Sequence, residues 1–135
     1  LAAVFNNAAE TTTISATAAT GTINIDFSTQ SVLYYTSNAS ANWIVNFRHS
    51  SGTSLNTALA IGQTITMTFL VTQGTTAYYN TSVQVDGTTT GVTTKWQNGI
   101  IPSAGDPSSI DVYTYAIIKT ASSTFTVIAT VTKYA

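Results

Sequence analysis

Short runs in which apolar and polar residues alternate are the feature that most restricts the fold of this chain. In the clearest run, residues 63–72, threonines occupy one face and four apolar side chains the other: Ile65, Met67, Phe69 and Val71. Alternation with a period of two is typical of a β-strand that buries one face. In residues 42–48 it places Asn46 and Arg48 on the outward face. Comparable runs predict further strands over residues 22–27, 32–35, 77–85, 92–97, 110–119 and 125–131.

Turn residues separate these runs at intervals of about 8–12 residues, a spacing typical of antiparallel sandwiches. The pattern therefore predicts an all-β fold, an antiparallel jelly-roll-like β-sandwich. We expect one hairpin between residues 63–72 and 77–85, and a second between residues 110–119 and 125–131. Asp86-Gly87 is a dipeptide that strongly favours a tight turn.

Residues 50–62 interrupt the β pattern and predict one short helix. Ser54 can cap a helix by accepting a backbone N–H bond. Leu55, Ala58 and Leu59 follow at the spacing of one helical face. Gly62 can end the segment because glycine readily adopts positive φ.

The length of 135 residues fits one domain. We divide the chain into an N-terminal arm and extended segment, residues 1–20, and a single β-sandwich domain, residues 21–135. The start of the arm is apolar, and Leu1, Val4 and Phe5 are candidates for docking on a neighbouring subunit. The alternative is a frayed terminus, which is common at chain ends.

The low charge of the chain restricts its partners. Charged residues make up 7% of the sequence and the net charge is −1. Nucleic-acid binding needs clustered basic residues, so the four scattered Lys and Arg argue against it. No apolar run approaches the roughly 20 residues of a membrane span, which argues against membrane insertion. Cysteine is absent, which leaves no disulfides and no thiolate metal ligands.

Catalytic patterns are missing from the sequence. The single histidine, His49, follows Arg48 at the end of a predicted strand, and no Gly-x-Ser-x-Gly elbow is present. A calcium site in the loop of residues 95–111 is conceivable through Asn98, Asp106 and Asp111, but their spacing does not match an EF-hand. We therefore predict no enzyme activity, no cofactor and no metal.

The loop of residues 95–111 is the most distinctive stretch. It holds both prolines of the chain and one of its two tryptophans. Its candidate contact or glycan surface consists of Trp96, Gln97, Asn98, Asp106 and Asp111, because sugar sites combine a flat aromatic face with amide and carboxylate groups. The alternative is that Trp96 anchors the loop by core packing while the two aspartates tie its return through Asx-turns.

Several ordered segments resemble a surface module of marine tailed bacteriophages, of the kind found in cyanophages. The segments that carry the resemblance are residues 32–43, 53–57, 65–74 and 95–99, with Pro102, Gly105, Ile110-Asp111 and residues 117–120. The resemblance covers residues 10–135. It implies a virion structural or tail-fibre-like protein and supplies no catalytic residues.

From this resemblance we expect a non-enzymatic structural protein on the particle surface, either a capsid decoration or knob, or a tail-fibre or appendage subunit. Its partners would be other virion proteins and copies of itself, with a homotrimer as the expected assembly by analogy with other virion appendages. Two alternatives stay open. One is a host-recognition module at a fibre tip that binds cell-surface glycans, and the other is a bacterial surface adhesion β-domain.

Overall fold

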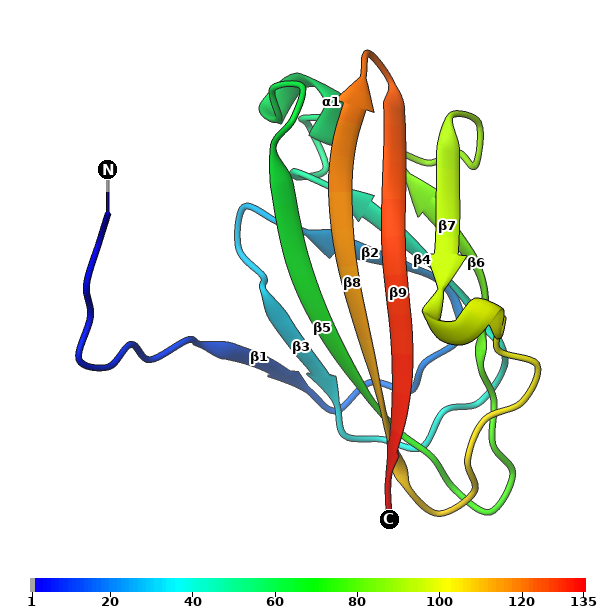
Figure 1. Ribbon diagram of the computed structural model, residues 1–135. Helices are drawn as coiled ribbons and strands as arrows, with labels where there is room; N and C mark the ends of the chain where they lie inside the picture. The colour runs from blue at the N-terminus through cyan, green and yellow to red at the C-terminus, as the bar shows by residue number, and fades with distance from the viewer. Residues whose placement is uncertain (1) are drawn as a thin grey trace.

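The computed structural model describes residues 2–135, which form two β-sheets packed face to face (Figure 1). The larger sheet has six strands in the order β1 (Thr12–Ser15), β3 (Val32–Tyr35), β5 (Thr64–Thr72), β8 (Ile110–Ala121), β9 (Thr124–Tyr134) and β7 (Val92–Trp96). The smaller sheet has three, in the order β2 (Gly21–Asp26), β4 (Trp43–Arg48) and β6 (Asn80–Val85). The predicted all-β sandwich is confirmed.

The path of the chain between the two sheets differs from the prediction. From β1 to β7, each successive strand lies in the sheet opposite to the one before it. Strands that re-enter a sheet therefore run in the same direction, and β1, β3 and β5 are mutually parallel, as are β2, β4 and β6. Only the β5–β8 and β8–β9 pairings are antiparallel among the described strands. The larger sheet is mixed, so the antiparallel jelly-roll arrangement is not confirmed.

One of the two predicted hairpins exists. Strands β8 and β9 pair in antiparallel register through a turn at Ser122 and Ser123, as expected. The hairpin predicted between residues 63–72 and 77–85 is wrong, because β5 pairs with β3 and β8 while β6 joins β4 in the other sheet. The turn signal after residue 72 is real, but the chain uses it to cross between the sheets.

The core lies between the inner faces of the two sheets and is rich in aromatic rings. Trp43 on β4 packs edge-on against Phe69 of β5 and Tyr113 of β8, with ring centroids 6.2 and 5.5 Å away. Phe47 packs against Tyr115 at 5.0 Å. Such pairs add to the free energy of burial because the ring edges meet the faces. Alternation correctly predicted the inward side chains of β4 and β5.

The predicted short helix is present as α1 (Leu55–Ala58). Ser54 Oγ accepts the Thr57 N–H at 3.0 Å, which is the expected capping bond. Gly62 has a φ of 89°, as its place after the helix suggested. A second, 3-10 helix, η1 (Gln97–Gly99), follows β7. Within residues 2–135, no helix is both long and apolar enough to cross a membrane.

Candidate functional site

The candidate contact loop begins at the end of β7, where Trp96 faces the core. Its indole packs edge-on against Tyr113 and Tyr115, with centroids 6.3 and 6.2 Å away. Gln97 and Asn98 follow in η1 with exposed side chains, and Asn98 has a φ of 57°. The structure thus separates the three residues: Trp96 is largely an anchor of the loop, while the two amide side chains face solvent.

The other end of the loop is tied to the body by a buried carboxylate. Asp111 on β8 is 1% exposed, and its Oδ2 accepts the Asp106 N–H and the Gln73 Nε2–H, both at 3.1 Å. Gln73 also bonds the backbone of Tyr78, donating to its carbonyl at 2.6 Å and accepting its N–H at 3.1 Å. Gln73 and Asp111 therefore join this loop to the β5–β6 connection.

Burial raises the pKa of Asp111 to about 6, and the nearby Asp106 contributes to this rise. Its Oδ1 is buried and has no hydrogen-bond partner among residues 2–135. Asp106 is more exposed and has Lys133 Nζ at 4.0 Å from its Oδ1. Among residues 2–135, no group of three or more His, Asp or Glu side chains is placed to hold a metal ion. Asp111 ties the loop through the Asp106 N–H, and the Asp106 carboxylate lies near Lys133 of β9.

A small groove lies beside Trp96. It has a volume of about 190 Å³ and is lined by Trp96, Gln97, Asn98, Ile100, Thr130 and Val131. Three of the predicted surface residues line this groove, whereas Asp106 and Asp111 do not. The five candidates therefore do not form one contiguous site.

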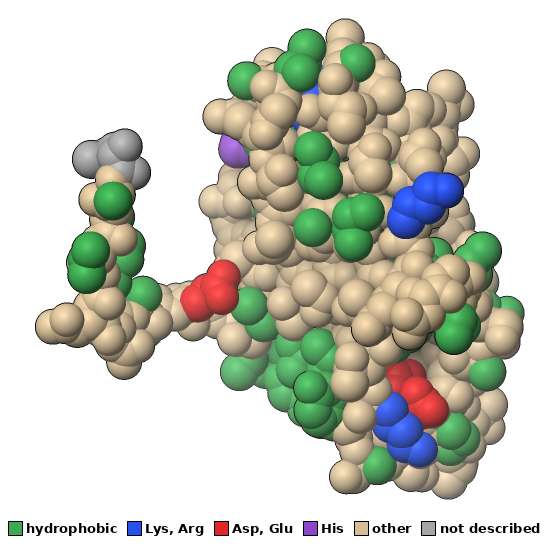
Figure 2. Space-filling model, viewed as in Figure 1, with side chains coloured by type: hydrophobic (Ala, Val, Ile, Leu, Met, Phe, Trp, Pro, Cys, Tyr) green, Lys and Arg blue, Asp and Glu red, His purple; other side chains and the backbone are tan. Residues whose placement is uncertain are grey.

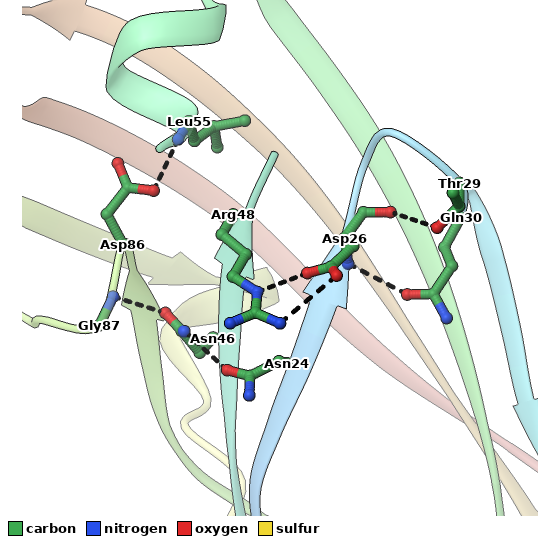
Figure 3. Close-up of polar contacts among 9 residues, drawn as sticks. All are labelled: Asn24, Asp26, Thr29, Gln30, Asn46, Arg48, Leu55, Asp86 and Gly87. Atoms are coloured by element: carbon green, nitrogen blue, oxygen red, sulfur yellow. Dashed lines mark hydrogen bonds and ion pairs between the residues drawn. The ribbon is translucent and has the colours of Figure 1, made fainter. Parts of the chain in front are cut away.

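A larger polar groove lies on the outer side of the small sheet, and sequence reasoning did not identify it. It has a volume of about 340 Å³ between residues 50–54 and the turn at Asp86-Gly87. Arg48 Nε donates to Asp26 Oδ1 at 2.5 Å, and Asn46 Nδ2 donates to Asn24 Oδ1 at 2.9 Å (Figure 3). Both pairs connect β4 to β2.

The turn at Asp86-Gly87 folds over this polar face. Asn46 Oδ1 accepts the Gly87 N–H at 2.8 Å, which buries Asn46 although it points away from the core (Figure 3). Asn46 thus lies on the outward face, as predicted, but the turn covers it. Asp86 accepts the backbone N–H groups of Leu55 and Asn56 at 2.6 and 2.9 Å and caps α1. Asn46, Arg48 and Asp86 at this groove therefore all bond other groups of the fold.

His49 is not part of the ion pair between Arg48 and Asp26. Within residues 2–135, no carboxylate lies within ion-pair distance of His49. The His49 carbonyl accepts the Ser28 N–H at 3.0 Å, a bond between the ends of two strands. Because a histidine base needs a group that orients it, this arrangement gives no support to a Ser-His-Asp site.

The N-terminal arm extends away from the sandwich on the side of β1 (Figure 1). Val4 is 92% exposed and Phe5 is 75% exposed, which is unusual for side chains of this size. Of the predicted docking residues, Leu1 lies outside the described part of the chain. β1 itself, within the predicted arm and extended segment of residues 1–20, pairs with β3 at the edge of the larger sheet.

The outer face of the larger sheet carries an apolar row next to the arm. The strand registers align Ile14, Tyr34, Leu70 and Val112 across β1, β3, β5 and β8. Ile14 is 68% exposed and the other three are partly exposed. Figure 2 shows hydrophobic side chains gathered on this face below the base of the arm. We call these four residues the apolar row.

Comparison with known proteins adds no relative: no family model, no curated protein and no solved structure matches this chain. The fold and the two grooves describe a β-sandwich whose buried polar side chains connect its own segments.

Proposed function

We propose that this chain is a non-enzymatic structural protein on the surface of a bacteriophage particle, as a capsid decoration or knob, or as a tail-fibre or appendage subunit. The observation that carries the proposal is the pair of exposed apolar features, the arm with Val4 and Phe5 and the apolar row. Exposed apolar area of this kind typically marks contacts with other proteins. The segments that resemble the phage surface module support the same role.

The polar side chains also support a structural role. Lys119 Nζ donates to the carbonyls of Asn56 and Leu59 at 2.5 and 2.8 Å, next to the end of α1. Asp86 caps the start of the same helix, and Asp111 ties the loop of residues 95–111. Polar groups that bond within the fold hold its segments in place and leave few free for chemistry. We therefore propose a protein without catalytic activity.

The proposed partners are other virion proteins and further copies of the chain, in a homotrimer at the particle surface. Closed rings of identical subunits arise from contacts between two different surfaces of each copy. The arm leaves from β1 at one edge of the larger sheet, and β7 forms the opposite edge. The arm and β7 thus belong to two different surfaces of one copy, and contacts between such surfaces can form a ring.

Immunoelectron microscopy tests the proposal. Antibody raised against the purified chain should label intact phage particles whose genome encodes it. Label over the head supports decoration, and label on the tail or fibres supports an appendage subunit. Particles that carry no label, and no peptides of the chain by mass spectrometry, would contradict a virion role and favour the bacterial surface domain.

A second candidate function, glycan recognition at a fibre tip, is favoured by the groove beside Trp96 with its exposed Gln97 and Asn98. A glycan array tests it. Saturable binding that is lost in Gln97→Ala and Asn98→Gly, with unchanged thermal unfolding, would support recognition. These two substitutions suit the test better than Trp96→Ala, because Trp96 packs against the core. Absence of binding leaves the structural role.

A further inference from the structure

We propose that the N-terminal arm of one copy docks as an added strand in the groove between β6 and β7 of a second copy, with Phe5 as its apolar anchor. This inference rests on the proposed function and deepens it, because it names the partner surface of the docking arm. Addition of an extended segment to an open sheet edge is a recurrent mode of protein recognition.

The arm forms no regular element and has no strand partner in its own copy. Residues 2–11 lie away from the sandwich and bend at Asn6, and residues 2–5 before the bend contain no turn (Figure 1). Successive side chains of a strand point to opposite faces, so Ala3 and Phe5 would share one face and Val4 the other. Phe5, at 75% exposure, is the largest side chain of the arm. The arm leads into β1, and β1 lies at the edge of the larger sheet opposite to β7.

The groove that would receive the arm lies where the two sheets come apart at their other edge. It has a volume of about 270 Å³. Val83, Val92 and Trp96 give it an apolar lining, and Ile101, which is 69% exposed, contributes from the loop of residues 95–111. None of its lining residues is charged. A phenyl ring in this groove would cover apolar surface that now contacts water.

Backbone groups at this edge are also available. Val85 exchanges two hydrogen bonds with Thr88, of 3.1 and 3.2 Å, across the free side of β6. Because backbone groups alternate in direction along a strand, the N–H and C=O of Val83 point to the same free side. The antiparallel pairing of Val85 with Thr88 does not continue, because the chain turns into β7 at Gly91, which has a φ of 76°.

The same alternation applies to β7. The Val92 N–H bonds the Thr89 carbonyl at 3.1 Å, away from the partner strand β9, so the backbone of Thr94 also faces the free edge. Packed sheets lie about 10 Å apart, which is close to two inter-strand spacings of about 4.8 Å. One extended segment between the edges can therefore approach both Val83 and Thr94.

The arm and the groove carry almost no charge. Glu10 is the one charged residue in residues 2–11, and Lys95 of β7 lies on the strand face opposite to the groove residues Thr94 and Trp96. Because arm and groove lie at opposite edges, the contact joins unlike surfaces and propagates from copy to copy, and it forms a ring, such as the proposed trimer, where the rotation between copies closes.

Disulfide trapping between two single-cysteine proteins tests the inference. Because the chain has no cysteine of its own, only the introduced residues can form a disulfide. Ala3→Cys, which keeps Phe5 and would share its face, is mixed with Ile101→Cys under mild oxidation. The matched control mixes Ala3→Cys with Ile61→Cys, because Ile61 is 65% exposed but lies before β5, away from the groove. We expect several-fold more mixed disulfide with Ile101→Cys. Equal yields with the two partners would overturn the inference.

Sedimentation velocity gives an independent measurement. Phe5→Asp should convert the oligomer into a folded monomer, because Phe5 is 75% exposed in its own copy, and Phe5→Leu should retain the oligomer. If the chain is an oligomer that Phe5→Asp leaves intact, or a monomer at all concentrations, the arm inference fails. The virion role is tested separately, by whether the antibody labels the phage particles.

Discussion

Asn80 on β6 donates a hydrogen bond from Nδ2 to the Tyr115 hydroxyl on β8 at 2.9 Å, and this bond joins the two sheets inside the core. The Asn80 N–H also bonds the Tyr113 hydroxyl at 3.4 Å. Burial raises the pKa of both tyrosines, so both stay protonated at neutral pH. The two hydroxyls thus give the buried amide polar partners in an otherwise apolar and aromatic layer.

Removing both partners of this bond should cost less than the sum of the costs of removing each one alone. Tyr115→Phe leaves the Asn80 amide buried without its acceptor, and we expect it to lower the free energy of unfolding by about 1–3 kcal/mol. Asn80→Ala removes the amide and leaves the hydroxyl. In urea unfolding, the double variant should be less destabilised than the sum of the two single variants. Strict additivity would show that the bond contributes nothing.

Asp86 should stabilise α1 through the two N–H groups that it accepts. We expect Asp86→Ala to lower the free energy of unfolding by about 0.5–2 kcal/mol, the usual range for loss of an N-terminal cap. Asp86 has a φ of 52°, which asparagine also adopts readily. Asp86→Asn is therefore the matched variant, and urea unfolding should show a smaller loss for it. Equal losses would assign the effect to charge.

The strands of this fold could be predicted from the sequence because alternation is local. The inward faces of β4, β5 and β9 follow directly from their apolar residues, and so does the hairpin of β8 and β9. The topology could not, because a turn signal shows where a strand ends and does not show which sheet receives the next one. The crossing between sheets is a property of the whole core.

The polar groove could not be predicted for the same reason, because it depends on which strands pair. Asp26 and Arg48 stand opposite each other only because β2 and β4 are parallel and in this register. Asn24 and Asn46 follow from the same register. The signal was present in the sequence as matched polar positions on two alternating runs. Without knowledge of the parallel pairing, nothing related one run to the other.

Gly105 should tolerate no side chain, because the loop of residues 95–111 approaches the β5–β6 connection closely there. A Cβ at Gly105 would lie 2.1 Å from the Tyr78 carbonyl oxygen, so the backbone would have to move. We expect Gly105→Ala to lower the free energy of unfolding by about 1–3 kcal/mol, as overpacking does. Gly52 has open space around it. Gly52→Ala is the control and should change the midpoint of urea unfolding little.

Asp111 should make stability fall as pH rises from about 4 to about 7. Its pKa in the folded state is about 6, above its ordinary value of 3.8, because burial disfavours the charged carboxylate. A raised pKa contributes stability that is complete below the unfolded pKa and is lost as pH rises through the folded one. We expect a loss of about 3 kcal/mol, measured by urea unfolding at a series of pH values. Asp111→Asn should flatten this segment of the profile, whereas Glu10→Gln on the exposed arm should leave it unchanged. A slope that persists in Asp111→Asn would assign the titration to another group.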